Sequence, residues 1–153
     1  MKLTSVLLLG LFTTAIVATS NSQTFSITVS PSQVEAASGS PIRITVRLAN
    51  TSDSEINLGT EAFVFGDVDA RFKHDCRDEA GQSVARTYPE LGNLGDRPMV
   101  ILKPGEIHTE TIDIGRPCNL GKPGRYEVQL SRDLPKSESN PVKSNRITVI
   151  VSP

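Results

Sequence analysis

Two histidines, His74 and His108, are the side chains of this chain that titrate closest to neutral pH, so they are its candidates for acid–base chemistry. A serine or cysteine nucleophile would need one of them as a positioned base. His74 continues an apolar stripe, His108 shares a strand face with Glu110, and neither belongs to a recognisable catalytic motif. We therefore predict that the chain is not an enzyme; the alternative, a hydrolase, would depend on one of these two histidines.

Three aspartates, Asp67, Asp69 and Asp75, carry the oxygen ligands that calcium prefers. Arg71 and Lys73 interrupt the same strand face, and the chain lacks the Asp-x-Asp-x-Asp-Gly calcium loop. Alternating charges of this kind are typical of a solvated strand. The sequence therefore predicts no metal site, and because it also lacks a glycine-rich phosphate loop, it predicts no cofactor.

Cys76 and Cys118 are the only cysteines, and an even number indicates a disulfide if the chain is exported, as its N-terminal leader (residues 1–20) predicts. A bond between them would close the loop from 76 to 118 and, by the chain-entropy relation, contribute about 4 kcal/mol. The alternative is a pair of free or redox-active thiols, although neither lies in a Cys-x-x-Cys motif. We expect a structural disulfide with no reactive role.

The first twenty residues have the layout of a signal peptide. Lys2 precedes an apolar run from Val6 to Val17, and small residues follow at 18–20. This run is short for a membrane span, which needs about 20 apolar residues. We expect cleavage after Ser20, within the window 18–22, and a secreted or periplasmic protein; the alternative is an uncleaved anchor helix.

The remaining residues, 21–153, have the length of a single domain. The whole chain has 16 basic and 17 acidic side chains, so removal of Lys2 leaves 15 against 17 and a net charge of −2. Nucleic acid or an anionic membrane would require a basic excess, so neither is expected as a partner. Tryptophan is absent and aromatic residues make up only 5%, which argues against a stacking surface for sugars or bases.

Alternation of apolar and polar residues predicts an all-β chain. The strands are expected at 25–30, 42–48, 56–58, 67–78, 100–102, 107–114, 125–130 and 147–151. The strand over 67–78 is predicted to be continuous, with Cys76 facing inward and Arg71 facing solvent. A change of parity within 107–114 predicts a β-bulge near Glu110 and Thr111. Short strands, polar turns and no convincing helix together predict an antiparallel β-sandwich.

Tyr126, in the phrase Pro123-Gly-Arg-Tyr126, resembles the tyrosine corner of immunoglobulin-like domains, in which a tyrosine hydroxyl bonds to backbone a few residues upstream. The order of phrases over Ile42 to Leu130 is also similar to that of BsuPI-type proteinase inhibitors. Those phrases are Asn50-Thr-Ser52, Asp78-Glu-Ala-Gly-Gln-Ser-Val84, Leu102-Lys-Pro-Gly-Glu106 and Pro123-Gly-Arg-Tyr126. Both resemblances imply an antiparallel immunoglobulin-like β-sandwich of about seven strands.

We expect a non-enzymatic, adhesion-type domain that binds another protein through its loops or an exposed sheet edge. The alternative is a BsuPI-like proteinase inhibitor, for which the long loop Gln82 to Pro98 would present Arg86 and Tyr88 as specificity residues. For the binding domain, the candidate surfaces are that same loop and the segment Leu58 to Gly66, which contains the apolar run 63–65. The alternative for the apolar run is a buried strand. Asn50-Thr-Ser52 also fits a glycosylation acceptor, if the host glycosylates exported proteins.

Overall fold

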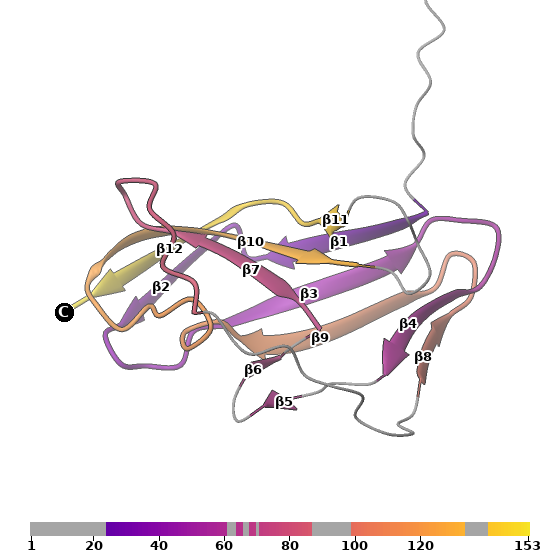
Figure 1. Cartoon of the computed structure of the whole chain (residues 1–153), viewed down its shortest axis with the longest axis horizontal. Coiled ribbons are helices and arrows are strands. Elements are labelled where there is room, and N and C mark those ends of the chain that lie inside the picture. Colours follow the sequence, from indigo (N-terminus) through magenta and orange to yellow (C-terminus); the bar gives the residue numbers. More distant parts are fainter. Residues whose placement is uncertain (1–23, 61–63, 66–67, 70, 87–98, 134–140) are drawn as a thin grey trace, which may run out of the picture.

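A computed structural model describes residues 24–60, 64–65, 68–69, 71–86, 99–133 and 141–153 (Figure 1). The predicted signal peptide, the apolar residue Phe63 and most of the long loop, including Tyr88, lie outside these ranges. All regular elements of the described residues are strands. They are β1 (Phe25–Ser30), β2 (Gln33–Ala37), β3 (Arg43–Asn50), β4 (Ile56–Thr60), β5 (Val64–Phe65), β6 (Val68–Asp69), β7 (Lys73–Arg77), β8 (Met99–Leu102), β9 (Ile107–Asp113), β10 (Gly124–Arg132), β11 (Val142–Lys143) and β12 (Ile147–Ser152).

Two sheets form the body of the fold. The first has three strands in the order β1-β3-β9, all antiparallel. The second runs β11-β10-β12-β2, and β7 pairs with β10 as well. Two short ladders, β4-β8 and β5-β6, accompany them.

Strict alternation along the longer strands builds the core between the sheets. Strands β3 and β10 each bury every second residue, so each presents one apolar face to the opposite sheet. Ile44, Val46 and Leu48 from the first sheet and Val128 and Leu130 from the second are at most 1% exposed. Full burial of such side chains contributes roughly 1.5–3 kcal/mol each, which is the main reason that the two sheets stay together.

The first strand is divided between the two sheets. After Ser30, whose peptide bond to Pro31 is cis, the chain leaves β1 and joins the second sheet as β2, parallel to β12. Asn145 reinforces this crossing, because its side chain accepts a bond from the Val29 amide at 2.8 Å and donates one to the Val29 carbonyl at 3.0 Å. The order β1-β3-β9 against β7-β10-β12 matches strands A, B and E against C, F and G of the immunoglobulin fold. The predicted immunoglobulin-like sandwich is therefore confirmed, with one parallel pair among otherwise antiparallel strands.

The single strand predicted over 67–78 is wrong. The structure divides it into β6 and β7, with a turn at Arg71 and Phe72 between them. Phe72 and Cys76 are buried as expected, but the turn breaks the alternation, so the Arg71 side chain is only 9% exposed. It forms an ion pair with Glu110.

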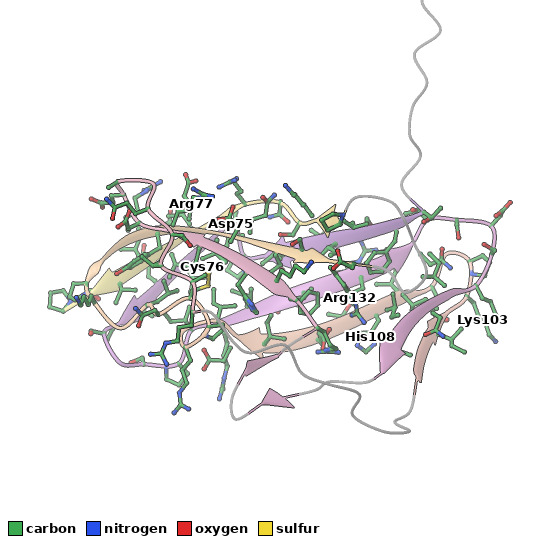
Figure 2. All side chains as sticks on the ribbon, viewed as in Figure 1. Asp75, Cys76, Arg77, Lys103, His108 and Arg132 are labelled. Atoms are coloured by element: carbon green, nitrogen blue, oxygen red, sulfur yellow. A yellow bond between two sulfur atoms is a disulfide. The ribbon has the colours of Figure 1, made fainter. Side chains whose placement is uncertain are left out.

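The predicted bulge near Glu110 and Thr111 is also wrong. Strand β9 pairs with β3 in unbroken register from Asp113 to Ile107. His108 (labelled in Figure 2) and Glu110 take inward-facing, half-buried positions on β9. Ile107 is left 46% exposed. The ion pair between Glu110 and Arg71 explains this arrangement. A carboxylate that is paired with a positive charge can occupy an inward-facing position, where a hydrophobic residue would otherwise be expected.

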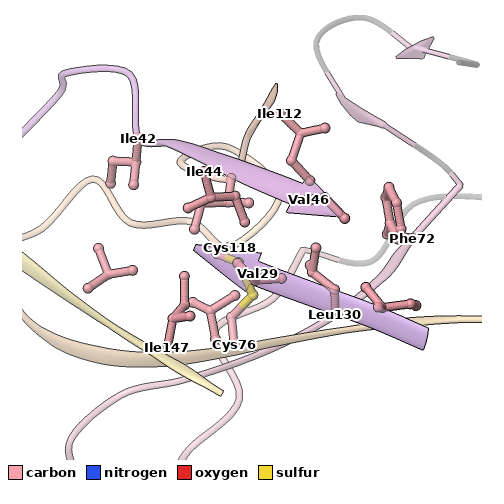
Figure 3. Close-up of a cluster of buried hydrophobic side chains, with 14 of the residues drawn as sticks. Val29, Ile42, Ile44, Val46, Phe72, Cys76, Ile112, Cys118, Leu130 and Ile147 are labelled. Atoms are coloured by element: carbon pink, nitrogen blue, oxygen red, sulfur yellow. A yellow bond between two sulfur atoms is a disulfide. The ribbon is translucent and has the colours of Figure 1, made fainter. Parts of the chain in front are cut away.

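The disulfide between Cys76 and Cys118 is present, and both cysteines are fully buried (Figure 3). It ties β7 to the connection between β9 and β10. Nearby, Tyr126 at the start of β10 is buried, and its hydroxyl donates to the Lys122 carbonyl at 2.9 Å. This is the upstream backbone contact that a tyrosine corner makes.

Asn50, the first residue of the glycosylation sequence, is 1% exposed. Its amide nitrogen donates to the carbonyls of Ser54 at 2.7 Å and Leu102 at 2.9 Å. Its amide oxygen accepts from the backbone nitrogen of Ser52 at 2.9 Å and from the Ser52 hydroxyl at 2.7 Å. Asn50 therefore organises the β3–β4 turn from inside the protein.

Candidate binding cleft

The structure has a cleft of about 500 Å³. Its described lining comes from the β2–β3 turn, from Arg86 beyond β7, and from the end of β9 with the β9–β10 connection. The β2–β3 turn and the β9–β10 connection lie at the end of the sandwich that also carries the C-terminus (Figure 1). The described lining residues are Gly39, Ser40, Pro41, Arg86, Asp113, Gly115, Arg116, Asn119, Leu120 and Gly121. Its volume falls within the range of sites that hold small molecules or single side chains of a partner, roughly 300–1,000 Å³.

The disulfide lies next to the cleft in sequence, because Cys118 precedes the lining residue Asn119. The segment that follows β7 is held near the disulfide by two backbone bonds, from Val84 to the Cys76 carbonyl at 2.9 Å and from Arg86 to the Pro117 carbonyl at 2.8 Å. The amide of Cys118 in turn bonds to the Ile114 carbonyl at 3.0 Å. The main chain of Arg86 is therefore positioned by covalent and hydrogen-bonded neighbours from distant parts of the sequence.

The positively charged residues of the described lining are Arg86 and Arg116, and both are exposed. Arg86 Nη2 lies 3.4 Å from Asn119 Oδ1. Asn119 has a φ of 50°, a left-handed conformation that asparagine tolerates better than most residues. Asp113 is the acidic residue among the described lining residues, and its Oδ1 accepts bonds from the amides of Gly115 at 2.8 Å and Ile42 at 3.3 Å. The described part of the lining thus combines two guanidinium groups with one carboxylate that is bound to the backbone of the turn.

A second polar group lies in the interior, away from this cleft. Besides the Arg71–Glu110 pair, it includes Arg132, which is 5% exposed and donates to the Leu58 carbonyl (Figure 2). The guanidinium carbons of Arg71 and Arg132 lie 5.6 and 5.7 Å from the centre of the Phe72 ring, within reach of a cation–π attraction. Because these groups fill core positions, we interpret them as part of the packing of the sandwich.

The residues singled out from the sequence are distributed over several places. Arg86 lines the cleft, whereas its predicted companion Tyr88 lies outside the described residues. His74 faces Leu130 in the register of the second sheet, and His108 faces Leu48 in the first. The two histidines therefore belong to different sheets, and each is half-buried.

Arg116 and Asn119 were missed as site residues. The signal that could have indicated them is the run Gly115-Arg-Pro-Cys118, in which a charged residue stands between turn formers and next to a disulfide cysteine. As for metals, the described ranges contain no cluster of three or more His, Cys, Asp or Glu arranged to hold an ion. No helix within them has the length and apolar character needed to cross a membrane.

The fold and the cleft define an immunoglobulin-like β-sandwich with an arginine-lined end. No protein-family model and no curated protein sequence matches the chain. Solved structures with similar folds include a β-glucosidase from Listeria innocua in complex with gluconolactone, at 18% identity and a TM-score of 0.38, over 82% of this chain and 16% of that chain. Another is the CsuC–CsuE chaperone–tip adhesion subunit pre-assembly complex from Csu pili of Acinetobacter baumannii, at 13% identity and a TM-score of 0.34, over 82% of this chain and 56% of that chain. This chain therefore spans less than two thirds of either protein, and neither likeness indicates an activity for it.

Proposed function

We propose that this chain is an exported, non-enzymatic domain that binds another protein through the end of the sandwich that carries the cleft. The observation that supports this proposal is the display of Arg86 and Arg116 on a frame fixed by the Cys76–Cys118 disulfide. Binding residues are commonly presented by loops on a rigid scaffold, and arginine is enriched at the energetic centres of interfaces.

The disulfide also supports the export part of the proposal. Such bonds form and persist in oxidising compartments, outside the cell or in a periplasm. Both sulfur atoms belong to fully buried residues, so the bond stabilises the fold and offers no accessible thiol. A secreted or periplasmic location follows from this argument together with the signal-peptide layout of the leader.

Capture of a partner on the immobilised protein tests the proposal. Ser40 lines the cleft and is exposed, so Ser40→Trp would fill the cleft without removing a charge. The matched control is Thr109→Trp, at an exposed position on the outer face of β9. We expect the wild-type protein and Thr109→Trp to retain a specific extracellular protein and Ser40→Trp to lose it. Equal capture by all three proteins would contradict binding at this end.

A second candidate function is proteinase inhibition, and one observation favours it. An inhibitor presents its specificity residue on backbone that changes little on binding. Arg86 fits this requirement in part, because its amide is bonded to the Pro117 carbonyl while its side chain is exposed. Titration against proteases that cleave after arginine tests the idea: stoichiometric inhibition that Arg86→Ala abolishes would support it, and no inhibition at micromolar protein would remove it.

A further inference from the structure

We propose that the free edge of β2 accepts an extended segment of another protein as an added strand, and that this segment carries a basic residue opposite Glu35. This inference rests on the proposed protein-binding function and specifies the conformation and the charge of the partner. An exposed strand edge binds such a segment through main-chain hydrogen bonds, and the side chains that alternate along it provide the specificity.

Strand β2 is bonded to the rest of the sheet along one of its two edges. It pairs with β12 and is the last strand in the order β11-β10-β12-β2. The Thr148 amide donates to the Ser32 carbonyl at 2.9 Å, and the Ser38 amide donates to the Ser152 carbonyl at 2.8 Å. In this parallel ladder, the residues of β2 that bond to β12 are therefore those with even numbers.

The alternate residues of β2, Gln33, Glu35 and Ala37, direct their N–H and C=O groups to the free edge, because main-chain groups of successive strand residues point to opposite sides. Within the described residues, one hydrogen bond reaches these groups, from the Ser40 amide to the Ala37 carbonyl at 3.1 Å. The side chains of all three residues are exposed. The edge thus offers both donors and acceptors to an added strand.

The opposite edge of the second sheet, on β7, differs from the edge on β2. There Arg77 forms a bridge with Ser83, and the Val84 amide donates to the Cys76 carbonyl at 2.9 Å. The segment that follows β7 therefore already occupies part of that edge. Among the strands of the described ranges, β2 has β12 as its partner and none on its other side.

Glu35 lies in the middle of the free edge and selects the partner by charge. Its Oε1 accepts a bond from Gln33 Nε2 at 3.0 Å, and within the described residues it forms no ion pair. Opposite charges directly across two strands stabilise their pairing, and like charges destabilise it. A second copy of β2 paired about Glu35 would bring two carboxylates together, whereas a lysine or arginine of a partner strand would balance the charge.

The inner face of β2 specifies the neighbours of that basic residue. Val34 and Ala36 are half-buried and pack against the core of the sandwich. An added strand would place its own residues of the same face beside them, where apolar side chains can cover them. The partner segment should therefore alternate apolar and polar residues, with the basic residue among the polar ones. Residues 39–41 of the cleft follow β2 directly, so this edge continues into the proposed binding end.

Peptide titrations followed by ¹⁵N NMR test the inference on the purified protein. The probe is the peptide Ser-Thr-Val-Lys-Val-Thr-Ser, acetylated and amidated, which has the required alternation. One control peptide has Glu in place of Lys. Another has methylated nitrogens in its Val-Lys-Val segment, which keeps the side chains and removes main-chain donors. The observed signals are the amides of Gln33, Glu35 and Ala37, together with their rates of hydrogen exchange.

Two pairs of variants locate the site. Glu35→Lys reverses the charge of the edge, and Glu79→Lys is its control at an exposed position in the turn after β7. Ala37→Pro removes a main-chain donor that faces the free edge, and Ala37→Thr keeps this donor. Proline is tolerated where an edge strand directs its N–H away from the sheet, so all four variants should fold, and thermal unfolding measures this. If Ala37→Pro does not fold, the methylated peptide provides the same test.

We expect the lysine peptide to shift the three amide signals and to slow their hydrogen exchange, and the methylated peptide to leave them unchanged. The glutamate peptide should bind roughly fivefold more weakly, because it places like charges across the two strands. Glu35→Lys should reverse this preference, and Glu79→Lys should retain it. Ala37→Pro should weaken binding of the lysine peptide roughly fivefold through the loss of one hydrogen bond, and Ala37→Thr should leave it within about twofold.

Three results of the titrations would overturn the inference: no change at β2 with the lysine peptide, an equal response to the methylated peptide, or the same peptide preference in Glu35→Lys as in the wild-type protein. Slow exchange of the three amides in the peptide-free protein, together with a dimer in sedimentation, would also overturn it. In that case a second copy of the chain would occupy the edge.

The proposed function has its own separate test. If Ser40→Trp loses the captured partner while Glu35→Lys and Ala37→Pro retain it, protein binding stands and strand addition at β2 fails. If the lysine peptide binds to β2 but Ser40→Trp still captures the partner, the proposed binding surface fails instead.

Discussion

Replacement of the buried Asn50 by alanine should be among the most destabilising polar substitutions in this protein. The Asn50 side chain makes four hydrogen bonds, two donated and two accepted, at a position that is 1% exposed. Each such bond has a net value of about 1 kcal/mol, so Asn50→Ala should lower the free energy of unfolding by about 4 kcal/mol. For a domain of about 130 residues this corresponds to a fall in Tm of about 15 °C.

Asn50→Asp distinguishes hydrogen bonding from simple loss of volume. It keeps both accepted bonds, but it places a carboxylate oxygen against the Ser54 and Leu102 carbonyls, where the amide now donates. The repulsion and the burial of a charge should make Asn50→Asp at least as destabilising as Asn50→Ala, although it is nearly isosteric. Denaturant unfolding followed by circular dichroism measures both.

The matched control is Asp53→Ala, in the same turn but exposed. It should change the free energy of unfolding by less than about 0.5 kcal/mol. If Asn50→Ala also falls within 1 kcal/mol of wild type, the hydrogen bonds described here do not support the turn and the reasoning is refuted.

The buried side chain of Asn50 also predicts that this residue carries no glycan. Because both of its amide hydrogens are donated to carbonyls, the folded protein secreted from a glycosylating host should have no glycan at Asn50. An intact mass with an added glycan at Asn50 would contradict this.

Three further predictions concern the stability of the sandwich. Reduction of the Cys76–Cys118 disulfide, which spans 42 positions, should lower the free energy of unfolding by about 4 kcal/mol, and an intact mass equal to that of the fully reduced chain would show that the bond is absent. Glu110→Met should destabilise by about 3 kcal/mol because it removes the carboxylate that pairs with the Arg71 guanidinium, a side chain that is only 9% exposed. The double variant Arg71→Met/Glu110→Met should recover most of this loss, and strictly additive effects in the double-mutant cycle completed by Arg71→Met would argue against the pair. Tyr126→Phe should remove one hydrogen bond, to Lys122, and about 1 kcal/mol, measurable by urea unfolding, whereas a neutral effect would mean that the hydroxyl contributes nothing.

The sequence was most informative where one physical requirement dominates. In β3 and β10, each alternate residue must be apolar because it faces the other sheet, so alternation alone was sufficient to predict the strand and its buried face. The disulfide followed from a similar constraint, because two cysteines in a chain that is predicted to be exported have only each other as partners.

Prediction failed where charged residues enter the core. From the polar character of the two residues, we predicted that Arg71 faces solvent and that the strand pattern is broken near Glu110. In the structure, the Arg71 and Glu110 side chains form an ion pair. A single sequence does not show which opposite charges will meet, since 39 positions separate them. The sequence did not predict the cleft either, because its described lining residues come from distant segments, 39–41, 86 and 113–121. Of these residues, only Arg86 had been proposed as a binding residue.

The division of the first strand between the two sheets has a mechanical consequence. Strand β2 runs parallel to β12 through five register pairs, from Gln33–Thr148 to Ala37–Ser152. The described N-terminal strand and the C-terminus lie at opposite ends of the sandwich, so tension between them acts along the strands (Figure 1). Such tension slides β2 against β12 and stretches all the bonds of that ladder together, whereas a pair loaded at one end would open bond by bond. If the protein is pulled at both ends, the whole β2–β12 ladder therefore resists the pulling force in shear.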